Sequence, residues 1–280
     1  MVDAHVHFWD PQRLDYPWLA EVPALQRAFL PADYARANQN ATAQVAKMIF
    51  VECGCAAAHT LEEVQWVSEL AAREPRLQGI VAQAAVELGQ RVKDGLAELA
   101  RQPLVKGVRR NLQGETDPDF CRRPDFVAGV RALAAHRFTF DLCIIHPQLP
   151  AVTELVRQCP EVQFILDHCG KPAIRDGQRE PWRQHLRELA SLPNVACKIS
   201  GLVTEASPAR CGAADLEPWV AHAVEVFGLE RVLFGGDWPV CQLATPFADW
   251  LASLQTILSG VAEASLVKVF QTNAERIYRV

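Results

Sequence analysis

Short apolar runs rich in β-branched and aromatic residues recur along the chain, and longer segments with a helical period separate them. The apolar runs predict eight strands: Val2–Phe8, Val45–Val51, Leu77–Val86, Val105–Leu112, Phe138–Ile145, Gln163–Cys169, Val195–Gly201 and Arg231–Trp238. The intervening segments predict helices at Thr60–Arg73, Gln90–Arg101, Phe126–Ala135, Pro181–Ala190, Ala214–Phe227, Phe247–Leu258 and Ala264–Tyr278.

A strand followed by a helix, repeated along the chain, is typical of parallel strands joined by right-handed crossovers. In a chain of 280 residues, the natural closure of such a series is a (β/α)8 TIM barrel. A doubly wound open sheet is the alternative. Because no linker, low-complexity tract or short repeat interrupts the series, we expect residues 1–280 to form a single domain.

The first predicted strand carries three polar side chains in an apolar run. Side chains alternate between the faces of a strand, so Asp3, His5 and His7 should share the face toward the barrel interior. The apolar side chains should then pack against the helices: Val2, Ala4 and Val6. Two imidazoles spaced in this way can bind one metal ion, although a pair of hydrogen-bonded core histidines is the simpler interpretation of an isolated H-x-H.

Two later strands also end in polar residues, His168 in "FILDHCGKP" and Asp237 in "VLFGGDWPV". Either residue alone is more typical of a cap or turn. In a TIM barrel, however, the carboxyl ends of strands one, six and eight surround one mouth. Imidazole and carboxylate suit Zn²⁺ or Mn²⁺, and three or four such ligands with an open position describe a catalytic site. The sequence therefore predicts a catalytic metal site at this mouth.

Two cationic residues lie within predicted strands. The alternation in "VKGVRRNLQ" points Arg109 into the mouth, where a guanidinium can polarise a substrate carbonyl or bind a carboxylate. The alternative is a buried ion pair with Asp141. Lys198 in "VACKISG" either binds substrate oxygens or balances buried carboxylates.

Composition excludes several classes of protein. A net charge of −5 without blocks of like charge disfavours nucleic acid and anionic membranes as partners. Residues 1–30 show no signal-peptide pattern, and no apolar stretch approaches the roughly 18 residues that span a bilayer. Nine cysteines without regular spacing predict a reduced, cytoplasmic protein, in which the thiols near strand ends are small buried apolar groups: Cys53, Cys55, Cys169 and Cys241.

The chain also lacks the G-x-S-x-G elbow, the P-loop, the dinucleotide G-x-G-x-x-G and the H-E-x-x-H motif. The chain therefore lacks the residues that serine hydrolases, kinases and dehydrogenases need for catalysis, and these three classes are disfavoured. Hydrolysis assisted by a metal, or by carboxylate and imidazole groups, remains.

Five segments, "DAHVHFWDP", "LDYPWL", "LDHCGKP", "CKISGLVTEA" and "FGGDWPVC", resemble the amidohydrolase superfamily, in its amidohydrolase-2 branch of barrel hydrolases that includes sugar-acid lactonases. The resemblance implies that His5, His7 and Asp237 bind one divalent metal ion, with zinc the first candidate, and that Asp237 also moves a proton. It places His168 as a further ligand or as the base. Some relatives act without a metal, so metal-independent catalysis is an open alternative. The resemblance does not require His146 as an extra metal ligand.

The resemblance thus implies a hydrolase that opens a small sugar lactone, an aldonolactone similar to L-fuconolactone, to its aldonic acid. Three tryptophans near the mouth would offer flat apolar surface to the sugar ring: Trp9, Trp18 and Trp238. The rival enzymes are a hydrolase of an anionic pyrone or muconolactone and a metal-dependent decarboxylase, both of which need a basic cluster such as Arg109, Lys171 and Lys198. A non-catalytic sugar-acid-binding protein is the third alternative, and a homo-oligomer is compatible with all of them.

Overall fold

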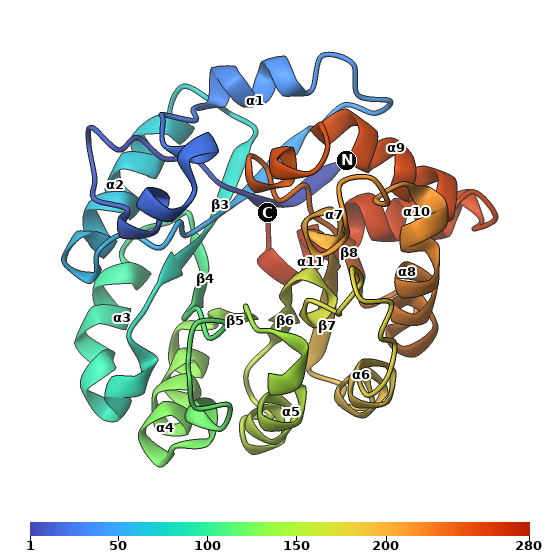
Figure 1. Cartoon of the computed structure of the whole chain (residues 1–280). Coiled ribbons are helices and arrows are strands. Elements are labelled where there is room, and N and C mark those ends of the chain that lie inside the picture. The colour runs from blue at the N-terminus through green and yellow to red at the C-terminus, as the bar shows by residue number, and fades with distance from the viewer.

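Eight parallel strands surround a common axis in the computed structural model, which describes residues 1–280 (Figure 1). The strands follow one another around the sheet in chain order: β1 (Val2–Val6), β2 (Lys47–Val51), β3 (Leu77–Gln83), β4 (Val105–Arg109), β5 (Thr139–Leu142), β6 (Phe164–Leu166), β7 (Val195–Ile199) and β8 (Val232–Phe234). The amide of His7 donates to the carbonyl of Trp238, and that of Asp237 to His5, both at 2.8 Å. These bonds join β1 to the residues after β8, which confirms the predicted TIM barrel.

Helices form a ring outside the strands (Figure 1). They are α1 (Pro31–Ala37), α2 (Thr60–Ala71), α3 (Lys93–Ala100), α4 (Pro124–Ala132), α5 (Leu149–Gln158), α6 (Trp182–Ala190), α7 (Leu202–Glu205), α8 (Ala213–Phe227), α9 (Phe247–Ile257), α10 (Glu263–Val267) and α11 (Asn273–Tyr278). The predicted helices lack α1, the short α7 and α5, of which α5 begins beside Pro150 and buries one apolar face, Val152 and Leu155 among others. None of these helices has the length and apolar character needed to cross a membrane.

The last predicted helix, Ala264–Tyr278, is divided in two. A π-helical turn at Lys268–Thr272 separates α10 from α11. The chain then ends at the amino-terminal ends of the strands, where the carbonyl of Val280 accepts from Lys47 and Arg279 donates to the carbonyl of Lys106. The carboxyl-terminal segment therefore covers the end of the barrel opposite the predicted site.

Strand β1 contains a bulge that changes which side chains face the interior. Asp3 pairs with Met48 and Val6 with Phe50, so that two residues, Ala4 and His5, stand opposite one residue of β2. The prediction of strict alternation is therefore right for His5, His7 and Val6 and wrong for the first half of the strand. There, two apolar side chains pack inside the barrel, Val2 and Ala4.

Asp3 faces the helix layer instead of the barrel interior. Its carboxylate accepts from the Tyr34 hydroxyl of α1 at 2.8 Å and from the Gly236 amide at 2.7 Å. Burial raises the pKa of this carboxyl to about 7. Asp3 thus joins α1 to the segment after β8, and it supports the mouth without lining it.

Candidate active site

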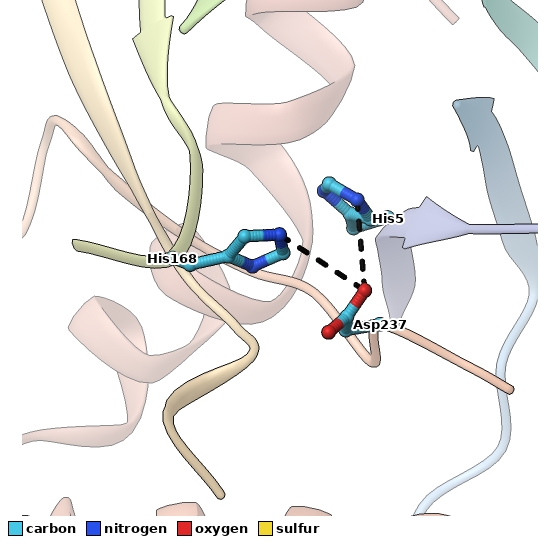
Figure 2. A group of neighbouring side chains, drawn as sticks. All are labelled: His5, His168 and Asp237. Carbon is cyan, nitrogen blue, oxygen red and sulfur yellow. Dashed lines mark ion pairs between the residues drawn. The ribbon is translucent and has the colours of Figure 1, made fainter. Parts of the chain in front are cut away.

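The structure brings His5, His7, His168 and Asp237 together at the carboxyl ends of β1, β6 and β8. The Nε2 atoms of His5 and His7 lie 3.1 Å apart, and the Asp237 Oδ1 atom lies 3.5 Å from His7 and 3.8 Å from His5. The His168 Nε2 atom approaches the same oxygen to 4.0 Å. Figure 2 shows the His5 and His168 rings on two sides of the Asp237 carboxylate. All four side chains are buried.

Backbone strain and close contacts hold two of these residues in place. His168 and Asp237 adopt φ angles of 55° and 53°, a left-handed conformation that side chains other than glycine seldom take. Two nearby glycines leave the required space, because a Cβ atom at Gly201 would lie 2.4 Å from the His168 ring, and one at Gly235 would lie 2.8 Å from the His5 side chain. The segments "FGGD" and "ISG" are therefore needed for the shape of the site.

The donor set fits a metal ion of the zinc type. The His7 Nδ1 atom lies 2.8 Å from the carbonyl oxygen of Val51, which can only accept, so the neutral ring carries its proton on Nδ1. The unprotonated Nε2 then faces the Nε2 of His5 and the carboxylate of Asp237. In a tetrahedral zinc site, bonds of 2.0–2.1 Å place the donor atoms roughly 3.3 Å apart, which is close to the spacings around His7.

Ionisation states agree with ligand roles. Burial lowers the pKa of His168 to about 4 and that of His5 well below its usual value, so both rings are neutral at pH 7. Burial alone would raise the pKa of Asp237, but the surrounding histidines, His168 first, lower it below its usual range. The site therefore presents neutral imidazoles and one carboxylate, as divalent-cation sites do.

Arg109 contacts the site from β4 and is held by two carboxylates. Its Nε donates to Glu52 at 2.6 Å, its Nη1 donates to Asp167 at 3.2 Å, and the same Nη1 lies 3.5 Å from the His5 ring. The alternative interpretation of Arg109, a buried ion pair, is right, but the suggested partner Asp141 is wrong. Asp141 is in register with Arg109 on the neighbouring strand, yet its carboxylate contacts a different cation, while the guanidinium reaches the carboxylates that follow β2 and β6.

That cation is Lys198, which is completely buried in β7. Its ammonium donates to Asp141 at 2.5 Å and lies 3.0 Å from Asp167. The Tyr278 hydroxyl of α11 donates to the same Asp141 carboxylate at 2.7 Å. Lys198 therefore balances buried carboxylates, and the alternative expectation of direct substrate binding is not met, since its side chain does not line the cavity above the site.

Two site residues, Glu52 and Asp167, are absent from the sequence prediction. Both follow apolar strand runs directly, Glu52 in "FVECG" and Asp167 in "ILDHC". The rule that selected His168 and Asp237, a polar residue at the end of a strand, applies to them equally. Their role differs, since they fix Arg109 and the His5 ring, whose Nδ1 lies 3.4 Å from Asp167.

A cavity of about 470 Å³ opens above the four converging residues. Trp18 lies on its wall, with its indole N–H donating to the Cys53 carbonyl at 2.7 Å. Trp9 also lines it, although that indole is buried and donates to the Arg27 carbonyl. Trp238 does not line the cavity: it packs among Phe8, Phe29 and Tyr34 between barrel and helices, so the expectation that it contacts a substrate is not met.

The remaining predicted residues lie at the edges of the site. Lys171 lines the cavity, where its ammonium donates to the Gln113 side chain. His146 does not line it, so the structure provides no support for this histidine as a further ligand. The four cysteines expected to be small buried groups are buried, as predicted: Cys53, Cys55, Cys169 and Cys241.

A histidine pair at the end of β1, a histidine after β6 and an aspartate after β8 thus meet at the end of the barrel where the active sites of this fold lie. Comparison with known sequences identifies the class of protein. The amidohydrolase family profile matches residues 2–280, and the chain belongs to this family. It is a hydrolase, as predicted.

Relatives with a named activity cover nearly the whole chain. An L-fucono-1,5-lactonase of Burkholderia ambifaria is 32% identical over 288 residues, which is 100% of this chain and 95% of the relative. An L-fucono-1,5-lactonase of Burkholderia multivorans is 37% identical over 267 residues, covering 90% and 86% of the two chains. A crystal structure of a Burkholderia multivorans amidohydrolase with bound zinc aligns over 100% of this chain and 99% of that chain, with a TM-score of 0.88 and 32% identity.

Proposed function

We propose that this protein opens a sugar lactone to its aldonic acid, and that residues 1–280 form the single catalytic domain that does so. The observation that carries the proposal is the convergence of His5, His7, His168 and Asp237 below a cavity large enough for a sugar ring. The two lactonase relatives support this substrate class, and an aldonolactone similar to L-fuconolactone is the first candidate.

These four residues would hold one divalent ion, and the relative with bound zinc supports zinc as the choice. Such an ion lowers the pKa of water and polarises a carbonyl oxygen. Asp237 is ionised and lies at the centre of the group, so it accepts a proton from the attacking water and passes it to the leaving ring oxygen. Without an ion, Asp237 and the neutral His168 are the bases that remain.

Arg109 has two roles: it helps to position the His5 ring, and it contacts the substrate directly. Glu52 and Asp167 hold its guanidinium rigidly, with one nitrogen beside the His5 ring. The guanidinium lines the cavity, so it can donate to the carbonyl oxygen of the lactone, on which negative charge grows during attack.

The charges of the cavity favour a neutral lactone over the anionic rivals. The two cationic side chains that line it, Arg109 and Lys171, already have partners: Arg109 pairs with Glu52 and Asp167, and Lys171 contacts Gln113 and Glu205. Lys198 is out of reach of the cavity. A pyrone dicarboxylate or a carboxylate destined for decarboxylation would therefore find no unpaired cation here, whereas a sugar can use amide and carboxylate groups such as Asn111 and Glu21.

The test is proton release from a panel of aldono-1,4- and aldono-1,5-lactones, with carbon dioxide release from hydroxybenzoates followed in parallel. We expect turnover of at least one lactone and none of the aromatic acids. A chelator followed by added zinc then measures the dependence on metal. Carbon dioxide release, or no reaction with any lactone, would overturn the proposal.

A further inference from the structure

A second cavity, of about 340 Å³, lies beside the main one on the same face of the barrel. The segments after β5 and β6 form its walls together with α7. Two residues, Lys171 and Thr204, line both cavities. The Lys171 ammonium donates to Gln113 at 2.5 Å and lies 3.7 Å from Glu205, so this one flexible side chain stands at the boundary.

The second cavity contains polar groups that the protein does not use. The Nδ1 atom of His146 is buried without a hydrogen-bond partner, which is uncommon for a buried polar atom. Arg175 and Asp176 are exposed, and their side chains form no hydrogen bond and no ion pair with the protein. The guanidinium and the carboxylate therefore offer donors and acceptors to a molecule in the cavity, while the His146 ring, whose Nδ1 is closed to such a molecule, forms part of the wall.

The shape and charge of the walls indicate what kind of molecule fits. Ile145, an apolar residue that is 40% exposed, and the rings of Pro147 and Pro172 provide apolar surface. One unpaired cation, Arg175, is matched by one unpaired anion, Asp176, so the cavity has no net charge to attract a phosphate. Apolar surface next to mixed donors and acceptors suits a neutral hydroxylated ring.

We infer that this second cavity is a subsite for a further sugar unit, and that the enzyme acts on lactones of disaccharide aldonic acids as well as on single-ring lactones. The inference rests on the proposed lactonase function. The lactone ring occupies the main cavity above Asp237, and the glycosyl group crosses the boundary at Lys171. The bond that breaks is the lactone ester alone, with water as co-reactant, and the glycosidic bond stays intact.

The first experiment compares glucono-1,5-lactone with three lactones that carry a glycosyl group on the same ring: the cellobiono-, maltobiono- and lactobiono-1,5-lactones. We expect at least one disaccharide lactone to show a kcat/KM about tenfold higher, as one or two net hydrogen bonds would give. In addition, gluconate and the three disaccharide aldonates are tested as inhibitors of the best monosaccharide lactone. The preferred disaccharide aldonate should inhibit about tenfold better than gluconate.

Variants of residues in the second cavity test whether the preference for disaccharide lactones arises there. His146→Ala and Asp176→Asn should each remove most of the disaccharide advantage and leave turnover of the monosaccharide lactone unchanged. Asp94→Asn, an exposed carboxylate on α3, serves as the matched control and should change neither. Equal loss with both substrates, or no advantage in either turnover or inhibition, would overturn the subsite. If a phosphorylated lactone is preferred instead, the neutral-sugar assignment is wrong, and if no lactone of any size reacts, the proposed function itself fails.

Discussion

The two ends of the barrel interior are built from opposite kinds of side chain. Toward the amino-terminal ends of the strands, aliphatic residues such as Val2, Ile49 and Val81 pack against Ile277 of α11. Toward the carboxyl ends, charged side chains cross the same space, with Arg109 and Lys198 placed between carboxylates. At one end of the barrel, the burial of apolar surface stabilises the fold. At the other end, the burial of charged side chains costs free energy of desolvation, and that cost is offset by their pairing.

The difference shows how a buried ionic layer can be tolerated. Cations and carboxylates alternate through it, so that each charge has an opposite neighbour: Glu52, Arg109, Asp167, Lys198 and Asp141. Burying a paired charge is roughly neutral in free energy, whereas removing one member leaves the other uncompensated. Truncating a side chain at the apolar end should thus cost only the lost packing, whereas removing one charge from the ionic layer should leave its neighbours uncompensated.

The largest effect is expected at Asp237. Asp237→Asn keeps size and shape, so the thermal transition should change little, whereas kcat/KM for the best lactone should fall by roughly 10²- to 10⁴-fold because an amide cannot accept the proton of water. Added zinc should not restore the rate. Recovery at high zinc would show that Asp237 is only a ligand, and His168 would then become the first candidate for the base.

Arg109→Met should be the most destabilising change at the charged end. It leaves Glu52 and Asp167 without their cation, and breaking a buried pair costs about 3–5 kcal/mol. Urea unfolding measures the loss, and activity should fall as well. Arg110→Met, which removes a half-buried arginine from its partners Glu87 and Glu115, is the matched control and should cost much less. A stable but inactive Arg109→Met protein would mean that the arginine acts on substrate alone.

At the apolar end, Ile277→Ala should reduce stability without changing the chemistry. Deleting buried methyl and methylene groups costs about 2–4 kcal/mol. Because Ile277 lies on α11, at the far end from the mouth, kcat/KM per folded molecule should stay within a factor of about two. A large fall in kcat/KM for the folded variant would show that the two ends are coupled.

Tyr278→Phe tests a hydrogen bond that joins the two ends. The phenylalanine keeps the ring among its apolar neighbours and removes only the hydroxyl that donates to Asp141. The expected cost is about 1 kcal/mol, since Lys198 still pairs with that carboxylate. Unfolding measurements in parallel with Ile277→Ala separate this polar contribution from the packing contribution.

Much of this arrangement follows from the sequence by simple rules. The spacing of apolar runs predicts the barrel, and polar residues at strand ends predict His168, Asp237 and Arg109. The partner of Arg109 did not follow, because strand alternation gives the direction of a long side chain but not its reach: Asp141, in register with Arg109, pairs with Lys198 instead. Helix α5 was missed although its buried residues have a helical spacing, because Pro150 in its first turn interrupts the pattern; proline is tolerated at that position of a helix. Trp238 lies beside Asp237 in the sequence, yet its side chain points to the opposite side of the chain.

The bulge in β1 has a consequence for engineering. Regular alternation would place Asp3 on the same face as His5 and His7, and the extra residue at Ala4 and His5 is what turns Asp3 toward the helix layer while both histidines face inward. Transplanting the two imidazoles alone into another eight-stranded barrel therefore needs only a regular strand, whereas transplanting them together with the Asp3–Tyr34 contact and the apolar lining needs the bulge as well. Deleting Ala4 from the present chain would leave Asp3 outward and the histidines inward, but it would remove one apolar side chain from the lining and move Val2 and Asp3 by one residue along the barrel. The single extra residue thus lets one short strand supply a support for the helix layer and two site residues on opposite faces.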